Sequence, residues 1–338
     1  MRAAVFTDFG DGDEVTIQER PDPEPSSGEA VIDVEACSIN RHDLWILQGE
    51  SAMVPKGALP FVSGLDAAGV VREAGEQTAV SEGDRVLLCP NQTCGECEFC
   101  REGPETLCKQ FMLYHGALAE QALVDASRLI PLPDSVGFAE AAALPTAYLT
   151  AWRMLLEADV EPTDLVFVPG ATGGVGVAAV QLAAVLGADA IGTSTSARKL
   201  AELDDLGCAH TIRSGDPEEL VREVRSIGDP DAVINHLGGE FTQAGLGVMK
   251  RGGTMVICGR TAGGSSSFKV APFFLQHKRI VGSTMGTQPE LETLVALVAD
   301  GDLEPPVDRT YSLEETGQAF DDMLEREAFG KLVVEPSR

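Results

Sequence analysis

The fold is decided by the stretch Val166-Phe-Val-Pro-Gly-Ala-Thr-Gly-Gly-Val-Gly176. The apolar run Leu165–Val168 predicts a buried β-strand, and the run 177–186, apolar all round, predicts a helix. A glycine-rich turn that joins a strand to a helix is the setting of a dinucleotide-binding site. The alternative that stays open is a tight turn in some other fold of alternating strands and helices, because residue 171 is alanine where the strict motif has glycine.

Three positions of the turn have separate roles. A small residue at Ala171 allows the tight turn, Gly173 lets a pyrophosphate approach the backbone, and Gly176 lets the helix pack against the strand. The free N–H groups and the positive dipole end of the helix then hold the phosphates. The predicted phosphate contacts are Ala171, Thr172, Gly173, Gly174, Val175 and Gly176.

The pattern of strands and helices changes along the chain. Short strands at Ala3–Phe6, Val15–Gln18 and Ala30–Ala36 predict a β-rich opening, and residues 137–156 predict a helix kinked at Pro145. From Asp164 onward strands alternate with helices, which predicts a doubly wound parallel sheet. The predicted strands are 190–193, 211–212, 232–235, 254–258 and 280–281; two helices, 289–300 and 316–325, and a strand, 331–334, follow.

Composition and charge limit the classes of partner. The 338 residues are enough for two domains, and the net charge of −28 comes from 53 acidic and 25 basic residues. Such a surface repels nucleic acid and anionic membranes, and no apolar run is long enough to span a bilayer. With no secretory signal pattern at residue 1, we expect a cytoplasmic protein. Only seven residues are lysine, which favours adaptation to high salt, where screening removes self-repulsion.

Four of the eight cysteines are clustered in the segment Cys94-Gly-Glu-Cys97-Glu-Phe-Cys100-Arg-Glu-Gly-Pro-Glu-Thr-Leu-Cys108. Four thiolates at this spacing can converge on one tetrahedral zinc ion. Because four protein ligands leave no open position, the metal would be structural. The alternative is a loop that carries four free thiols.

These motifs together resemble the medium-chain dehydrogenase/reductase superfamily, which includes zinc alcohol dehydrogenases and quinone oxidoreductases. The resemblance also rests on Gly64-x-Asp66-x-x-Gly69-Val-Val, Gly83-Asp-Arg-Val86, Gly252-Gly-Thr and Gly330-Lys331-Leu-Val. It implies an α/β protein with two domains. Residues 1–147 and 285–338 would form a GroES-like β-rich catalytic domain with a zinc lobe at about 89–110, and residues 148–284 a Rossmann domain.

The sequence departs from the zinc alcohol dehydrogenases at the positions that hold their catalytic metal. Those places carry Asn40, Leu65 followed by Asp66, and Thr146, which are poor zinc ligands. We therefore expect no catalytic metal, and the pattern Asn40-x-x-Asp43 resembles the quinone oxidoreductase branch. A rival interpretation builds a zinc site from His42, Asp43 and Asp66.

The end of the second predicted strand of the Rossmann domain favours NADP(H) over NAD(H). The stretch 191–199 has no acidic residue to bind ribose hydroxyls, and it supplies Ser194, Ser196, Arg198 and Lys199 for a 2′-phosphate. The alternative is that Arg198 and Lys199 begin a solvated helix. By resemblance, Arg41 and Lys331 would approach the cofactor phosphates, and the backbones of Cys258, Gly259, Ser283 and Met285 would line the nicotinamide.

Without a catalytic metal, hydride transfer is easiest to a quinone or an α,β-unsaturated carbonyl compound. Asn40 is the first candidate to donate a hydrogen bond to the developing oxyanion, Thr146 and Thr150 are further candidates, and Asp43 would orient neighbours. Two alternatives remain, a zinc alcohol dehydrogenase acting on alcohols and aldehydes, and a structural protein that binds NADPH. The resemblance implies a homodimer or homotetramer, with a subunit edge at Met255–Val270.

Overall fold

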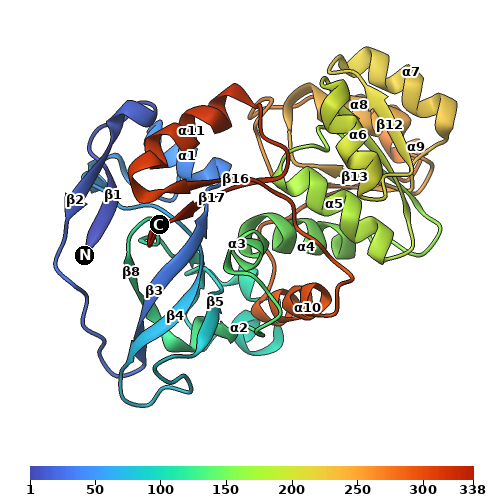
Figure 1. Ribbon diagram of the computed structural model, residues 1–338. Coiled ribbons are helices and arrows are strands. Elements are labelled where there is room, and N and C mark those ends of the chain that lie inside the picture. Colours follow the sequence, from blue (N-terminus) through green and yellow to red (C-terminus); the bar gives the residue numbers. More distant parts are fainter. The chain divides into compact units, whose positions relative to one another are not determined.

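The computed structural model describes residues 1–338, except for the side chain of Lys56, and the chain divides into two compact units (Figure 1). Unit 1 consists of Met1–Thr146 and Thr287–Arg338, and unit 2 consists of Ala147–Gly286. Each unit has its own sheet, and both are described separately below.

Unit 2 is built on a six-stranded parallel sheet covered by helices. In spatial order the strands are β12 (His210–Arg213), β11 (Asp189–Ser194), β10 (Leu165–Val168), β13 (Ala232–Asn235), β14 (Thr254–Ile257) and β15 (Arg279–Gly282). The helices are α4 (Leu149–Glu157), α5 (Gly174–Val185), α6 (Ala197–Asp205), α7 (Pro217–Ile227), α8 (Gly239–Val248) and α9 (Val270–Leu275). This arrangement confirms the predicted Rossmann sheet, in which strands buried on both faces are rich in valine and isoleucine.

The edge of this sheet differs from the expectation for Met255–Val270. Strand β14 lies inside the sheet, because β15 pairs with it in parallel from Thr254 opposite Arg279 to Ile257 opposite Gly282. Strand β15 is therefore the outermost strand on that side. The strand at 280–281 is predicted from the sequence, but its place beside β14 at the edge of the sheet is set by the pairing of the two strands.

Unit 1 is built on a mainly antiparallel sheet of seven strands. Its order is β16 (Val307–Ser312), β17 (Lys331–Glu335), β3 (Glu29–Ser38), β4 (Asp66–Ala74), β5 (Arg85–Leu88) and β9 (Leu129–Pro131), and β8 (Gln121–Asp125) also pairs with β3. A hairpin of β1 (Arg2–Phe6) and β2 (Val15–Glu19) lies apart from it in the pairing. The helices are α1 (Arg41–Leu47), α2 (Glu98–Glu102), α3 (Phe138–Ala142), α10 (Gln288–Ala299) and α11 (Thr316–Glu325). The GroES-like β-rich domain is thereby confirmed.

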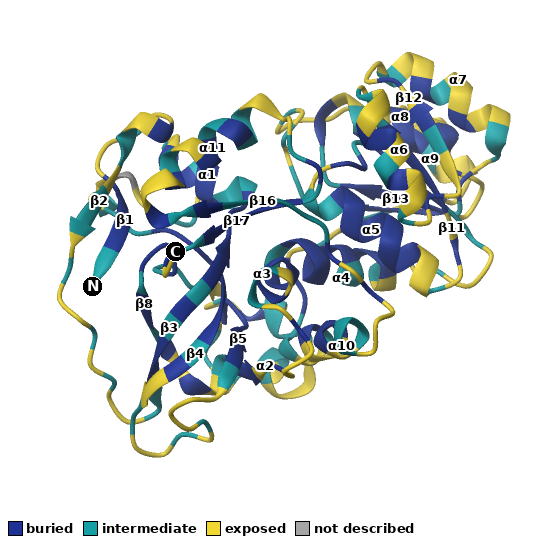
Figure 2. Ribbon diagram, viewed as in Figure 1, coloured by how far each residue is buried: buried dark blue, intermediate teal, exposed yellow. Residues whose placement is uncertain are grey.

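Apolar side chains hold each unit together. In unit 1 the ring of Phe6 packs edge-on against that of Phe320, with ring centroids 5.4 Å apart. In unit 2 the middle of helix α5, residues 176–183, is buried, which Figure 2 shows as dark blue over most of the helix. Residues 177–186 are apolar on all faces of the helix because the helix is buried on several sides.

Two segments differ in detail from the sequence expectations. The predicted helix 137–156 is divided into α3 and α4 by a π-helical turn, Leu144–Tyr148, because Pro145 lacks the N–H that a continuous helix needs. The polar segment 37–49 contains the short helix α1. Its start is fixed by Asn40 and Asp43, since the Asp43 carboxylate accepts a hydrogen bond from the Asn40 backbone N–H.

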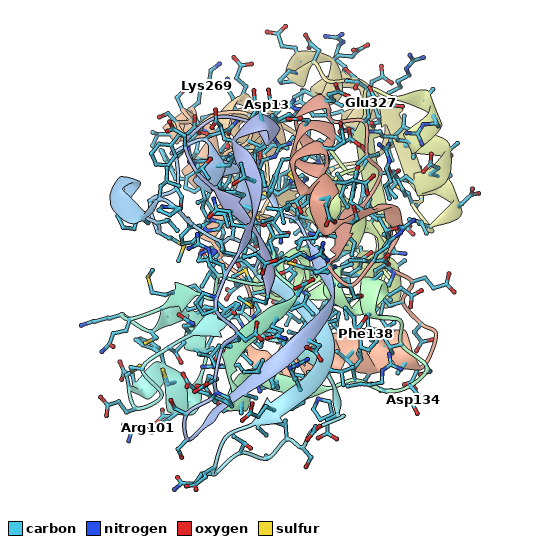
Figure 3. All side chains as sticks on the ribbon, turned by 60° about the vertical axis from the view of Figure 1, so that its left-hand side comes forward. Asp13, Arg101, Asp134, Phe138, Lys269 and Glu327 are labelled. Carbon is cyan, nitrogen blue, oxygen red and sulfur yellow. The ribbon has the colours of Figure 1, made fainter. Side chains whose placement is uncertain are left out.

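Acidic side chains extend outward over much of the surface. Figure 3 shows Asp13, Asp134 and Glu327 among them, and all three are exposed. Within the described chain, no helix is both long enough and apolar enough to cross a membrane.

Candidate functional site

The glycine turn of unit 2 connects β10 to α5 at the point where the strand order reverses, which is where ligands bind in such sheets. Gly173 is the N-cap residue of α5, and a Cβ atom placed on it would meet nothing within 4 Å. At Gly176 a Cβ atom would lie 2.6 Å from the carbonyl oxygen of Gly170, so a side chain is excluded there. The turn therefore offers open backbone N–H groups at a helix N-terminus, which suits a pyrophosphate.

Polar atoms without partners lie at the same edge of the sheet. Among the described residues, His236 Nε2, just after β13, and Ser283 Oγ, just after β15, are buried and have no hydrogen-bond partner. Burial lowers the pKa of His236 to about 4, so its ring is neutral at pH 7. Buried polar groups are normally satisfied, and a bound cofactor with amide and hydroxyl groups would satisfy these. The chain thus fits a nicotinamide cofactor in unit 2.

The residues predicted near the nicotinamide follow the ends of β14 and β15. Cys258 and Gly259 come directly after β14, and a Cβ atom on Gly259 would lie 2.1 Å from the carbonyl oxygen of His236. Thr150 on α4 and Met285 are brought together, with Thr150 Oγ1 3.8 Å from the Met285 sulfur. Thr150 is therefore placed in unit 2 beside a predicted cofactor residue.

Hydroxyl groups gather beyond the end of β11. Thr172 Oγ1 lies 3.2 Å from Ser194 Oγ, and Ser194 Oγ accepts a hydrogen bond from the Ser196 N–H. Ser196 in turn caps the start of α6, which carries Arg198 and Lys199. Arg198 forms an ion pair with Glu202 at 2.6 Å. Lys199 is only 6% exposed, and a buried lysine is uncommon.

Arg213 is a cation that the sequence interpretation missed. It pairs with Ser194 in the register of β11 and β12, and its Nε donates a hydrogen bond to the carbonyl oxygen of Thr195 at 3.2 Å. Only the pairing of the two strands brings it to this place, because it is 19 residues further along the chain than Ser194.

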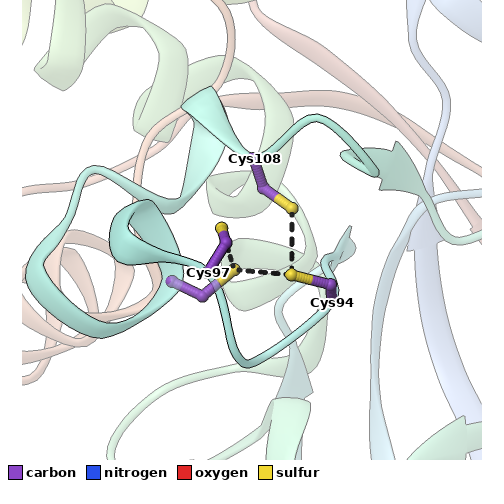
Figure 4. A group of neighbouring side chains, drawn as sticks. Cys94, Cys97 and Cys108 are labelled. Carbon is purple, nitrogen blue, oxygen red and sulfur yellow. Dashed lines mark hydrogen bonds between the residues drawn. The ribbon is translucent and has the colours of Figure 1, made fainter.

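The four cysteines of the lobe in unit 1 lie around a common centre. Their ligand sulfurs are all within 4.8 Å of one another, and the Cys97–Cys100, Cys94–Cys108 and Cys94–Cys100 separations are 3.4, 3.6 and 3.8 Å. A tetrahedral zinc site with Zn–S bonds of about 2.3 Å needs sulfurs about 3.8 Å apart. Figure 4 shows the labelled sulfurs turned toward each other. The lobe therefore fits a closed structural zinc ion.

The thiols of the cluster differ in pKa, since a backbone hydrogen bond from Cys100 lowers the pKa of Cys97, but desolvation and hydrogen bonds from neighbouring cysteines raise it to about 11. Desolvation opposes ionisation of Cys100, but hydrogen bonds from Thr93, Cys97 and Cys108 lower the pKa of its thiol to about 6. Of the described side chains, no other set of three or more His, Cys, Asp and Glu residues lies close enough to share an ion. The rival set of His42, Asp43 and Asp66 is accordingly not brought together as a ligand group.

A buried hydrogen-bond network occupies the place where the resemblance predicts catalytic zinc ligands. Its centre is the carboxylate of Asp66, which is 0% exposed. Oδ2 accepts hydrogen bonds from Ser38 Oγ and Asn40 Nδ2, both at 2.9 Å, and Oδ1 accepts one from Thr146 Oγ1 at 2.6 Å. Leu65 beside it is buried in the core, so it contributes only packing.

Lys331 supplies the positive charge of this network. Its Nζ lies 3.7 Å from Asp66 Oδ2, and it donates hydrogen bonds to the Ile39 carbonyl at 3.0 Å and to Asn40 Oδ1 at 2.5 Å. Burial lowers the pKa of Lys331 and raises the pKa of Asp66. The expectation that Lys331 approaches cofactor phosphates is revised, because its ammonium is buried and committed to these partners.

The predicted roles of Asn40 and Thr146 are revised in the same way, but the predicted role of Asp43 is not. The Asn40 amide hydrogens go to Asp66 and, at 3.4 Å, to the Ser38 carbonyl, and Thr146 donates its hydroxyl hydrogen to Asp66. Neither has a donor left for a substrate oxygen. The Asp43 carboxylate accepts hydrogen bonds from Ser63 Oγ at 2.6 Å and the Gly64 N–H at 3.0 Å. Its expected orienting role therefore has a structural basis.

Two histidines of unit 1 have ring nitrogens without partners. The rings of His42 and His115 stack with centroids 5.5 Å apart, and the edge of Phe61 approaches His115. Among the described atoms, His42 Nε2 and His115 Nδ1 are buried and lack hydrogen-bond partners. Burial lowers the pKa of both, to about 4 for His115, so they are neutral at pH 7. His115 is absent from the sequence prediction because it stands in no recognisable motif.

Arg41 begins α1 and is half-buried. Its burial and the charge of Arg326 lower the pKa of the Arg41 guanidinium. Two cations held close to each other favour an anion beside them. The expectation that Arg41 approaches a cofactor phosphate stays a prediction.

Comparison with known proteins finds a matching family for each of the two units. Residues 26–134 match the family described as alcohol dehydrogenase GroES-like domain, and residues 174–300 match the family described as zinc-binding dehydrogenase. The chain is 29% identical to an acryloyl-coenzyme A reductase of Metallosphaera sedula, and 30% identical to an alcohol dehydrogenase of Moraxella sp.. In each case 99% of both chains is covered. A crystal structure of an NAD-dependent alcohol dehydrogenase is similar with a TM-score of 0.90 and 33% identity, again over 99% of both chains.

Proposed function

We infer the function from the premise that this chain belongs to the medium-chain dehydrogenase/reductase superfamily and is an NAD(P)H-dependent oxidoreductase. We propose that it reduces α,β-unsaturated carbonyl compounds or quinones with NADPH and without a catalytic metal. The observation that carries the proposal is the network around Asp66. Its carboxylate is satisfied by three side-chain hydrogen bonds and the Lys331 ammonium, so the place of the catalytic zinc ligands offers no free donor set.

The reaction then depends on a substrate that is already activated. NADPH supplies a hydride, and a conjugated acceptor takes it without the Lewis acid that a plain ketone or alcohol requires. The chain's own residues hold the phosphates at the glycine turn and offer hydrogen bonds to the carbonyl oxygen. His42 and His115 are the candidate donors, because each has a buried ring nitrogen without a partner and is neutral at pH 7.

The relatives support two functions. An acryloyl-coenzyme A reductase acts on a conjugated thioester, which favours the proposal, whereas the alcohol dehydrogenases favour a zinc-dependent enzyme. The two differ in metal content, because the proposal requires one zinc ion per chain, in the cysteine lobe, and the alternative requires two. A structural NADPH-binding protein would show no turnover. We further propose a cytoplasmic homodimer or homotetramer whose partner is a small carbonyl or quinone substrate.

The proposal is tested by NADPH oxidation against matched substrates together with metal analysis. We expect turnover with an enone, an enoyl thioester or a quinone, and little with the corresponding saturated ketone. We also expect that plasma emission analysis finds one zinc per chain. Two zinc ions per chain combined with oxidation of plain alcohols would refute the proposal in favour of an alcohol dehydrogenase.

Cofactor choice gives a second prediction. Replacing Arg198 or Arg213 by alanine is expected to raise the KM for NADPH about tenfold, a loss of about 1.4 kcal/mol, because we propose that each guanidinium pairs with the 2′-phosphate, although Arg198 pairs with Glu202 and Arg213 with the Thr195 carbonyl in this structure. The KM for NADH should hardly change.

The matched control is Arg251→Ala, since Arg251 is exposed and precedes β14, at the opposite end of the sheet from the glycine turn. Equal changes in the KM for NADPH and for NADH in the Arg198 and Arg213 variants would show that these residues do not bind the 2′-phosphate. Preference of the wild type for NADH, the cofactor type named for one structural relative, would also contradict the assignment.

The net charge of −28 gives a third prediction. We expect the melting temperature to rise as KCl increases from about 0.01 M to above 1 M, because the screening length falls from about 30 Å to about 3 Å. Surface ion pairs weaken at the same time, but they contribute little. Sulfate at matched ionic strength separates screening from effects on apolar burial. A melting temperature that stays level or falls would exclude adaptation to high salt.

A further inference from the structure

A cavity of about 700 Å³ lies on unit 2 away from the glycine turn. It is lined by residues of α7 and α8 and by the segment 268–278, which contains α9. None of its lining residues belongs to the glycine turn, to the hydroxyl cluster after β11 or to the ends of β14 and β15. Its volume is in the range of small-molecule sites, about 300–1,000 Å³.

One wall of the cavity is apolar. The rings of Phe268 and Phe273 contact each other with centroids 5.1 Å apart, and Val221 and Leu246 line the cavity with them. Phe268 is 40% exposed, so an aromatic side chain faces solvent on an otherwise strongly acidic chain. Such a wall is suited to the hydrocarbon part of a ligand.

A buried ammonium group lies at one end of the cavity. Lys278 is only 9% exposed, and its Nζ donates one hydrogen bond, to the Leu246 carbonyl at 2.5 Å. No carboxylate of the described residues forms an ion pair with it. An ammonium has three donors, and a buried cation without a counter-ion is costly. A helix-terminal carbonyl alone therefore leaves Lys278 incompletely satisfied.

Charge is divided between the two ends of the cavity. Arg225, whose guanidinium donates to the Gly247 carbonyl at 2.8 Å, lies with Lys278 at the C-terminal ends of α7 and α8. The acidic lining residues Asp216, Glu218 and Glu240 belong to the N-terminal ends of the same helices and are exposed. Residues 218 and 225 are about 10 Å apart along the helix at 1.5 Å per residue. At the cationic end Lys278 is buried and Arg225 is exposed, and the acidic end faces water, as does the further lining residue Lys269.

We propose that this cavity binds a small amphipathic anion, an aliphatic or aromatic carboxylate, whose head group pairs with Lys278 and whose hydrocarbon part lies against Phe268 and Phe273. The anion supplies the directly paired counter-ion that Lys278 lacks, since Asp229 acts on its charge without forming an ion pair, and Arg225 adds a second positive charge at the same end. Because the cavity is formed by unit 2 alone, binding does not depend on the proposed reaction or on the zinc lobe.

The test is calorimetric titration of the full chain with decanoate, and with 1-decanol as an uncharged compound of matched length. We expect one decanoate per chain, bound at least tenfold more tightly than decanol, with an affinity that is the same with and without NADPH. Lys278→Met is expected to weaken decanoate at least tenfold and leave decanol unchanged, because methionine keeps the apolar stem. Lys250→Met, which removes an exposed partner of Asp231, is the control and should change neither.

A second variant keeps the test valid if Lys278→Met does not fold. Phe268→Ser lies on the apolar wall and should weaken decanoate and decanol by the same factor. The proposal is overturned if the wild type does not bind decanoate, or if Lys278→Met binds it as the wild type does. It is equally overturned if sedimentation shows that decanoate binds only when two copies of the chain separate, because the cavity would then be a subunit contact.

Discussion

Lys331→Met is expected to lower the free energy of unfolding by about 3–5 kcal/mol, the usual cost of removing one partner of a buried ion pair. The substitution keeps the length of the side chain but leaves the Asp66 carboxylate, which is 0% exposed, without its counter-charge. Ser38, Asn40 and Thr146 continue to donate hydrogen bonds to it, but none of them carries a charge. Urea unfolding monitored by circular dichroism measures the loss.

The pH dependence of this variant has a defined sign. Burial raises the pKa of Asp66, and loss of the ammonium removes the largest influence that opposes this rise. The unfolded chain has an ordinary aspartate pKa of about 3.9, so the folded state binds the proton more tightly. The deficit of Lys331→Met should therefore be small near pH 4 and grow as the pH rises toward 7.

Two controls separate charge from packing. Asp66→Asn combined with Lys331→Met removes both charges and should abolish the pH dependence of the deficit. Lys250→Met removes an exposed pair with Asp231 and should cost about 1 kcal/mol or less. If Lys331→Met lost no more than Lys250→Met at pH 7, the ammonium would not be what stabilises the carboxylate.

Cys97→Ser is expected to release zinc from the lobe and to lower the melting temperature of unit 1. A serine hydroxyl is a poor zinc ligand, and changes of outer-sphere partners alone weaken metal sites by about 10–100-fold. Loss of a direct ligand should cost at least about 100-fold in affinity, which is about 2.7 kcal/mol of stabilisation by bound metal. NADPH affinity should persist, since the glycine turn belongs to unit 2.

The control for this prediction is Cys208→Ser. Cys208 is buried in unit 2 and its sulfur contacts the carbonyl oxygens of Ala190 and His210, so its replacement should leave the zinc content unchanged. Plasma emission analysis after dialysis gives the metal content, and calorimetric scanning gives the melting temperatures. A Cys97→Ser protein that retained one zinc per chain would show that this residue is not a ligand.

The sequence was sufficient for features that depend on neighbouring residues. The strand Leu165–Val168 is found as predicted, and the four cysteines of the lobe converge as their spacing indicates. In both cases the relevant contacts are made within a short segment. The glycine turn belongs to the same class, because its strand and helix are adjacent in the chain.

Features that depend on distant segments could not be predicted. The sequence predicts that Asn40 and Thr146 donate hydrogen bonds to the substrate oxygen, but in the structure Asp66 accepts a hydrogen bond from each of them. Arg213 reaches Thr195 only through the pairing of β12 with β11. The stacking of His42 on His115 joins segments that share no motif. Each of these contacts is set by the tertiary fold and not by local pattern.

The position of β17 has a consequence for the order in which the polypeptide is made. This strand lies between β16 and β3 in the sheet of unit 1, so the sheet joins residues 29–38 to residues 331–335. On the ribosome, all of unit 2 is synthesised before β17, so the early strands of unit 1 are made long before the strand that pairs with β3. Until residue 331 is translated, Asp66 has no cation to pair with. The nascent chain therefore carries an incomplete unit 1 until β17 is made, and β17 completes the sheet.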